Sequence, residues 1–309
     1  MEINRVSVVT PFSLVASVLL CHDRRGISHD DLTAVLKSFY DYLSYKKVNF
    51  AATLLHKEKA FVDALNLFDE SGIISKMGAE EEEPDEMEEI VYSLEDDNRL
   101  NLEYYKNNIL HFFVPISFVA TSLLSSHEDM IPLNRLVKDF QFLKRLFWQE
   151  FIFDDRRDDL DEVNDVLSYL NSRGMISALE HDGQALVEVK GKGKTNLMPF
   201  AGLISNYMES YWVVIRGCMY LRKDAMLEKD WMRKIQQLGA KMYKKGEIRR
   251  AEAMSQSNYQ SAMQFLQDAD IVHVSEASDR GDKKEVKIFA LAGNKAEMDS
   301  LRRRLFEFL

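Results

Sequence analysis

NLEYYKNNILHFFVPISFVATSLL, residues 101–124, is a long apolar pattern that carries Tyr105, Asn107 and His111 ahead of Pro115. Its second half has an earlier near-copy, because TPFSLVASVLL at residues 10–20 aligns with VPISFVATSLL at residues 114–124. Six positions are identical at an offset of 104 residues. Solenoid repeats have periods of about 20 to 50 residues, so a repeat at this longer distance predicts tandem units instead.

The sequence that follows each copy also repeats, and it predicts the fold class. ESGIIS at residues 70–75 corresponds to SRGMIS at residues 172–177, and each follows a helical pattern and opens an extended segment. We therefore expect an α+β protein that is mostly α, with three tandem helical units that each carry a winged-helix-like β-hairpin. The third unit is the most diverged, and DADIVHV takes the place of SGIIS there.

The expected units have distinct boundaries and wings. Unit one covers residues 1–97, with helices starting at Pro11, after Ser28 and near Lys57, and an acidic wing loop at residues 78–89. Unit two covers residues 98–196 and has a hairpin at residues 175–190, since Asp-Gly between alternating runs is a strong turn signal. Unit three covers residues 197–309, with a hairpin at 271–292 and a C-terminal helix.

Composition narrows the class of protein. The chain has 309 residues, of which only 13 are Gly and 5 are Pro, so helices should dominate. Its two cysteines, Cys21 and Cys218, lie in apolar helical patterns and are expected to be buried, reduced thiols. We expect no secretory signal and no transmembrane span, because residues 109–124 contain His111 and Pro115 and are short for a bilayer.

Charge is unevenly distributed along the chain. The net charge is −10, which disfavours nucleic acid as a partner unless basic residues gather on one face. Residues 80–89 contain eight carboxylates and predict a solvated loop, because their spacing matches no EF-hand. The third unit has a basic set that could be solvated, or could face anionic lipid, an acidic partner or nucleic acid. Its members are Lys241, Lys244, Lys245, Arg249 and Arg250.

Motifs for chemistry are absent from the sequence. None of the seven histidines has Asp five positions later, so no His-x-x-x-x-Asp acyltransferase motif is present. We find no Gly-x-Ser-x-Gly, His-Glu-x-x-His or Cys-x-x-Cys either, and predict no catalytic, cofactor-binding or metal-ligating residue. Gly193-Lys194-Thr195 lacks the earlier glycine of a phosphate-binding loop, and we expect it in a loop after the second hairpin.

His111 allows two interpretations. Tyr105, Asn108 and His111 share a helical spacing, which could mark a catalytic cluster. The alternative is a structural cluster where helices pack, with His111 hydrogen-bonded in the interior. The sequence favours the structural role, since no nucleophile, metal partner or nearby Asp accompanies the histidine.

These residues resemble the C-terminal region of the bacterial and mitochondrial glycerol-3-phosphate acyltransferases. The resemblance is carried by INRVSVVTPFSLVASVLL, by RRGIS, by LEYYKNNILHFF and by ESYWVV. Tyr105, Asn107 and His111 resemble the Tyr-x-Asn-x-x-x-His signature of that family. The family's His-x-x-x-x-Asp motif belongs to an N-terminal catalytic domain with no counterpart here, so the resemblance supplies no catalytic residue.

The resemblance implies a pathway and a partner. The expected reaction is acyl transfer from acyl-CoA or acyl carrier protein to the 1-hydroxyl of glycerol 3-phosphate, the first step of phospholipid synthesis. The chain would be an accessory, structural part that supports the catalytic acyltransferase domain and is inactive alone. It would lie in the cytoplasm or peripherally on the cytoplasmic face of the inner membrane. The alternative is a freestanding winged-helix module that binds nucleic acid or a protein.

Overall fold

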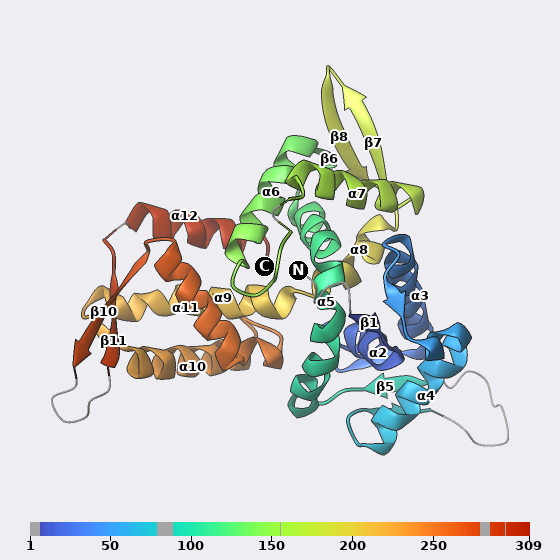
Figure 1. Cartoon of the computed structure of the whole chain (residues 1–309), viewed down its shortest axis with the longest axis horizontal. Helices are drawn as coiled ribbons and strands as arrows, with labels where there is room; N and C mark the ends of the chain where they lie inside the picture. The colour runs from blue at the N-terminus through green and yellow to red at the C-terminus, as the bar shows by residue number, and fades with distance from the viewer. Residues whose placement is uncertain (1–6, 79–88, 155, 279–284, 294) are drawn as a thin grey trace. The chain divides into compact units, whose positions relative to one another are not determined.

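The structure is a computed structural model that describes residues 7–78, 89–154, 156–278, 285–293 and 295–309 (Figure 1). It is mostly helical with small antiparallel sheets, which confirms the α+β class. The chain groups into two compact units. Unit A comprises residues 1–141 and 154–204, and unit B comprises residues 142–153 and 205–309. The predicted boundaries at residues 97 and 196 stay a prediction.

The two near-copies found in the sequence become two helices that pack on each other in unit A. Helix α2, Pro11–Leu20, begins after a Thr10 N-cap whose hydroxyl accepts from the Ser13 amide, with Pro11 in the first turn as predicted. Helix α5, Asp96–Ser125, lies against α2 and α8 (Figure 1). Side chains of α2 are almost all buried, and the apolar half of α5 is buried with them.

Helix α5 is longer than the sequence pattern predicts, and Pro115 lies inside it. Pro115 has no N–H to donate to the carbonyl of His111, four residues earlier, yet the helix continues through it. By length and composition α5 is apolar enough to cross a membrane, and it is the one described helix that passes this test. Its most apolar window is 67% buried within the protein, which favours the role of a core helix.

The remaining helices of unit A cover this core. Ser28 caps helix α3, His29–Tyr45, as predicted, by accepting from the Asp31 amide. A short 3₁₀ helix, η1, Ala52–His56, leads into α4, Lys57–Glu70, whose buried face contacts α2. Helix α6, Leu133–Leu146, and helix α7, Asp159–Ser172, follow α5, and α7 contacts it.

The predicted second hairpin is present. Strands β7, Ile176–His181, and β8, Gln184–Val189, pair in antiparallel register. Asp182 and Gly183 link them with φ angles of 52° and 74°, as a type I′ turn requires.

The predicted loop at Gly193 is wrong, because Gly193 begins helix α8, Gly193–Gly202. A Cβ at Gly193 would lie 2.2 Å from the carbonyl oxygen of Met175. Glycine at this position therefore allows the chain to turn tightly from strand β8 into a helix.

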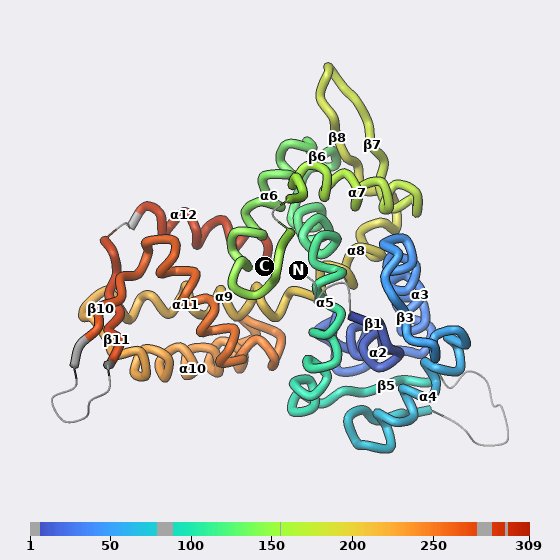
Figure 2. The backbone as a smooth tube through the Cα atoms, viewed as in Figure 1, coloured from blue at the N-terminus to red at the C-terminus, as the bar shows by residue number. Residues whose placement is uncertain are grey.

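Unit B is built around helix α9, Ser205–Gly217, which extends into the 3₁₀ helix η2, Cys218–Arg222. Helices α10, Glu228–Lys244, and α11, Gln256–Asp268, pack on α9, with the 3₁₀ helix η3, Ala251–Met254, between them in the chain. Helix α12, Lys295–Phe306, contacts α9 and ends close to the C-terminus (Figure 2).

Three small sheets share one element order. A short strand precedes two helices, and a pair of strands follows, with the short strand paired to the last strand. The first sheet has the order β2-β5-β4, with β2 at Gly26–Ser28, β4 at Ser75–Met77 and β5 at Val91–Ser93. The second has the order β6-β8-β7, with β6 at Met130–Pro132. The third has the order β9-β11-β10, with β9 at Met226–Leu227, β10 at Val272–Ser278 and β11 at Glu285–Leu291. A two-stranded parallel pair joins β1, Val8–Val9, to β3, Asn49–Phe50.

Most of the predicted acidic wing loop, at residues 79–88, lies outside the described residues. Its solvated character stays a prediction.

Candidate functional site

Tyr105, the first residue of the predicted signature, packs where three helices meet. Its ring centroid lies 5.4 Å from that of Phe68 on α4 and 6.1 Å from that of Phe12 on α2. Phe12 and Phe68 also contact each other edge to face, at 5.4 Å. Aromatic contacts of this kind stabilise helix packing, and the structural role of the signature residues stays a prediction.

Asn107 and His111 differ from each other in burial. Asn107 is exposed, whereas His111 is half-buried, and its ring is tilted against that of Phe112 at 3.9 Å between ring centroids. Burial lowers the pKa of His111, which favours the neutral imidazole. Its Nε2 is buried without a hydrogen-bond partner among the described residues, unlike the interior hydrogen bond expected from the sequence. Phe112 supplies an apolar neighbour instead.

Two buried cations on α5 were missed by the sequence analysis. Arg99 and Lys106 are seven residues apart, two helical turns, and are 3% and 2% exposed. Nη2 of Arg99 donates to the carbonyl oxygen of His22 at 2.9 Å, and Nζ of Lys106 donates to that of Leu203 at 3.2 Å. Glu103 pairs with Lys106 at 2.7 Å, so this buried ammonium has a counter-charge.

Both acceptor carbonyls lie at the ends of helices. Leu203 is the C-cap residue of α8, and His22 follows Cys21, the C-cap residue of α2. The last carbonyls of a helix have no intrahelical donor, and a cation there is favourable for the helix dipole. Arg99 and Lys106 therefore fasten α5 to the C-terminal ends of α2 and α8.

The two helix ends also touch each other directly. A Cβ at Gly202 would lie 1.6 Å from the carbonyl oxygen of Cys21. Only glycine allows the α8 backbone to approach α2 this closely. Cys21 is buried and free, as is Cys218 in unit B, which confirms the expectation for both thiols.

Unit B contains the other buried ionisable groups. Burial raises the pKa of the Glu150 carboxyl to about 7, against the opposing effect of the neighbouring Ser261 and Tyr211 hydroxyls. Glu209 accepts from the backbone amides of Arg249 and Arg250, at 3.1 and 2.9 Å, and thereby holds the segment before η3.

Each carboxyl lies beside polar groups of its own unit: hydroxyls for Glu150 and backbone amides for Glu209. The absence of catalytic residues stays a prediction. Within the described residues no group of three His, Cys, Asp or Glu could hold a metal ion.

The basic set of the third predicted unit is only partly on the surface. Lys241, Lys244, Lys245 and Arg249 are exposed, but Arg250 is 6% exposed. Its backbone amide is held by Glu209. Arg250 is therefore not available to a lipid surface, which leaves four exposed residues in the basic set.

Comparison with known proteins identifies the protein family. The family model described as the glycerol-3-phosphate acyltransferase C-terminal region matches residues 1–275. The chain belongs to this family, as its resemblance to the Tyr-x-Asn-x-x-x-His signature predicts.

Individual relatives carry the corresponding name. The glycerol-3-phosphate acyltransferase of Aeromonas hydrophila is 29% identical over 241 residues, which are 77% of this chain and 28% of that protein. That of Shewanella halifaxensis is 26% identical over 252 residues, again 77% and 28%. That of Pasteurella multocida is 25% identical over 240 residues, or 74% and 27%. The matched part of the chain spans less than a third of these relatives.

Proposed function

We propose that the chain is the accessory C-terminal part of a glycerol-3-phosphate acyltransferase. It would support a catalytic domain that transfers an acyl group from acyl-CoA or acyl carrier protein to the 1-hydroxyl of glycerol 3-phosphate. The observation that carries this proposal is the match of residues 1–275 to the C-terminal region of that family. The contacts of two buried cations agree with it, because Arg99 and Lys106 donate hydrogen bonds to carbonyl oxygens at helix ends and not to a reacting atom.

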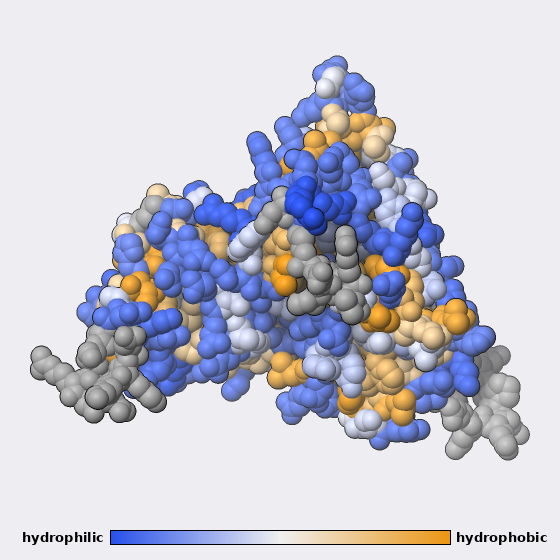
Figure 3. All heavy atoms as spheres, in the orientation of Figure 1, coloured by the Kyte–Doolittle hydropathy of each residue, from blue (hydrophilic) through white to orange (hydrophobic). Residues whose placement is uncertain are grey.

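A candidate face for the catalytic domain lies on the exposed side of α5. Leu100 and Tyr104 are four residues apart and are 54% and 72% exposed. Figure 3 shows that apolar side chains interrupt the hydrophilic surface in several places on the face drawn. Exposed apolar side chains of this size are common at protein interfaces. Burial against a second domain would remove them from water.

A chimera tests the accessory role. This chain would replace the matching C-terminal region of the Aeromonas hydrophila enzyme, and acyl transfer from acyl-CoA to glycerol 3-phosphate would be measured. We expect activity from the chimera, and none from the isolated chain or from the enzyme truncated before the match. Turnover by the isolated chain, or activity of the truncated enzyme equal to that of the chimera, would refute the proposal.

Surface variants of the chimera test the docking face. Leu100→Ser and Tyr104→Ser should lower activity severalfold, while Asn164→Ser, an exposed change on helix α7, should not. Equal activities for the three variants would exclude this face as the contact. The melting temperature of each isolated variant chain shows whether the loss is one of docking or of folding.

We further propose that unit B contributes to peripheral attachment at the cytoplasmic face of the inner membrane. Support comes from Lys241, Lys244 and Lys245, which are exposed near the end of α10. The chain should float with vesicles that contain phosphatidylglycerol, and less so after Lys244→Glu and Lys245→Glu. Equal flotation with neutral phosphatidylcholine vesicles would contradict an electrostatic attachment.

The second candidate function is a freestanding winged-helix binding module. It is favoured by the threefold recurrence of strand, two helices and paired strands, which we propose to be winged-helix-like units. The net charge of −10 and the acidic first turn of α7, with Asp159, Asp161 and Glu162, oppose a nucleic-acid role. A salt-sensitive gel shift of duplex DNA would support this function, and no shift at low salt would exclude DNA.

A further inference from the structure

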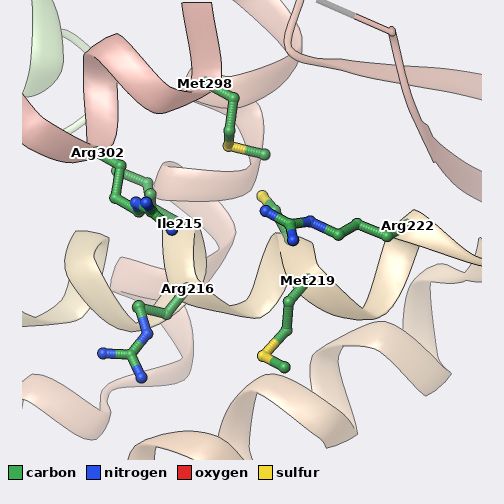
Figure 4. Close-up of a pocket in the computed structure, with 7 residues that line it drawn as sticks. Ile215, Arg216, Met219, Arg222, Met298 and Arg302 are labelled. Carbon is green, nitrogen blue, oxygen red and sulfur yellow. The ribbon is translucent and has the colours of Figure 1, made fainter. Parts of the chain in front are cut away.

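Unit B contains a pocket of about 240 Å³ that no step of the proposed function uses (Figure 4). It lies among helix α9, the 3₁₀ helix η2 and helix α12. Its lining combines three arginines with apolar side chains and contains no acidic residue. The arginines are Arg216, Arg222 and Arg302, and the apolar residues include Ile215, Met219 and Met298.

The three arginines differ in how their charge is balanced. Arg216 lies over the Trp212 ring at 5.6 Å and 3.5 Å from Oε2 of Glu247, and Figure 4 shows it pointing away from the other two. Arg302 has Asp299 at 3.8 Å, close to the outer limit for an ion pair. Arg222 forms no ion pair with a carboxylate in the described part of the chain.

Arg222 from η2 and Arg302 from α12 line the same pocket, and Figure 4 shows the guanidinium of Arg222 reaching into it. A guanidinium stays charged at any physiological pH, so two of them in one pocket lining repel each other. An anion between them would turn this repulsion into two charge-assisted hydrogen-bond pairs. Guanidinium groups suit phosphate and carboxylate oxygens in particular, since both can be held by two parallel N–H donors.

The apolar lining adds a second requirement for the ligand. Ile215 and Met298 are 3% and 9% exposed, and Met298 points into the space near Arg302 and Arg222. Met219 is 53% exposed at the rim. Methionine side chains adapt to chains of variable shape, so Met298 suits the first carbons of a hydrocarbon tail, whereas Met219 points away from Met298 (Figure 4). Pockets for whole drug-sized ligands measure about 300 to 1,000 Å³, so this one accommodates a head group and the start of a chain.

We propose that this pocket binds the head of a single-chain amphiphile that bears a phosphate monoester. Arg222 and Arg302 hold the phosphate, Met298 contacts the first carbons, and the rest of the chain leaves the pocket. The inference is independent of the accessory role, because the binding measurement needs no catalytic domain.

Calorimetric titration of the whole chain tests the ligand class. Dodecyl phosphate below its critical micelle concentration is the probe, with inorganic phosphate and dodecyl maltoside as the two partial ligands. We expect saturable binding of one dodecyl phosphate, at least tenfold weaker binding of inorganic phosphate, and none of dodecyl maltoside. Equal affinity for inorganic phosphate would indicate a simple anion site. Saturable binding of dodecyl maltoside would indicate a simple apolar site. Either result would overturn the proposal.

Matched variants test the place of binding. Arg222→Gln and Arg302→Gln should each weaken dodecyl phosphate binding about tenfold. Lys223→Gln and Arg303→Gln, which remove the same charge from neighbouring exposed positions outside the lining, should change it less than twofold. Met298→Gln should weaken dodecyl phosphate binding and leave inorganic phosphate binding unchanged. Equal losses in lining and control variants would show nonspecific surface attraction and reject the pocket.

Discussion

At the scale of single residues, the buried ionisable side chains should have the largest measurable effects on stability. Lys106 is 2% exposed and its ammonium pairs with Glu103 at 2.7 Å while it donates to the Leu203 carbonyl. Removing one member of a buried pair leaves the other charge in the interior without compensation, and typically costs about 3 to 5 kcal/mol. The pair therefore links the stability of unit A to one side chain of the signature stretch.

We expect Lys106→Met to lower the free energy of unfolding by about 3 kcal/mol, measured by urea denaturation. The double variant Glu103→Leu with Lys106→Met should recover part of this loss, because no uncompensated charge remains. Asn108→Ala, an exposed change on the same helix, should alter stability by less than about 0.5 kcal/mol. A Lys106→Met variant as stable as this control would contradict the assigned role.

Glu150 makes the stability of the protein depend on pH. Burial raises the pKa of this carboxyl from 4.5 to about 7, so the folded state binds a proton that the unfolded state releases above pH 4.5. The folded-state pKa lies above the unfolded value; stability from this group is therefore complete below about pH 4.5 and declines as the pH rises toward 7.

Glu150→Gln should remove this decline. Relative to the unchanged chain, the variant should gain up to about 3 kcal/mol between pH 4.5 and 8, by the conversion of about 1.4 kcal/mol per pKa unit. Thermal or urea unfolding across this pH range measures the difference. Stability curves that run parallel at all pH values would show that Glu150 is not buried in its neutral form.

At the scale of elements, the repeated helices α2 and α5 form the core of unit A by packing on each other. Ala16 and Ala120, which occupy equivalent positions in the two copies, are both fully buried. A small side chain at these positions leaves room for the facing helix. Enlarging it forces neighbouring side chains out of their preferred rotamers.

Ala120→Leu should destabilise the protein by about 1 to 3 kcal/mol, even though leucine has nearly the helix propensity of alanine. Asn108→Leu places the same side chain on an exposed position of α5 and should change stability by less than about 0.5 kcal/mol. The two variants are compared by urea unfolding. If both behave alike, helix propensity rather than packing governs the site.

At the scale of the whole molecule, each compact unit is made of two segments that are separated in the chain. Residues 142–153 belong to unit B, although the segments on both sides of them, residues 1–141 and 154–204, belong to unit A. Within unit B this segment supplies Phe147, whose ring lies 5.0 Å from Tyr211, and Phe151, whose ring lies 5.2 Å from Tyr207. A fragment that starts at Ser205 would leave both tyrosines without these partners.

We therefore expect residues 205–309 alone to unfold at a lower temperature than the same fragment with residues 142–153 joined through a flexible linker. Circular dichroism during heating measures the difference, and binding of a dye specific for exposed apolar surface reports the uncovered aromatic rings. A segment of the same length and composition in scrambled order is the control. Equal melting temperatures for native and scrambled segments would show that unit B does not depend on these residues.

The sequence by itself determined the local elements and the family. The sequence predicted the starts of α2, α3 and α4 and the hairpin at Asp182-Gly183, and the Thr10, Ser28 and Asp158 caps lie where such residues are favoured. It did not predict β2, β6 and β9, because strands of two or three residues carry no period and exist only through pairing with a distant strand. The resemblance of Tyr105, Asn107 and His111 to the family signature agrees with the match to residues 1–275.

Only the tertiary structure decided which charged side chains are buried and what they meet. Nothing in the local sequence distinguishes Lys106 from the exposed Lys244, or Arg250 from Arg249. The pairing of Lys106 with a helix end, the raised pKa of Glu150, and the shared pocket of Arg222 and Arg302 all join residues that are distant in the chain or lie on different helices. The physical reason is that periodicity is a property of neighbouring residues, whereas desolvation depends on whichever distant element covers a side chain.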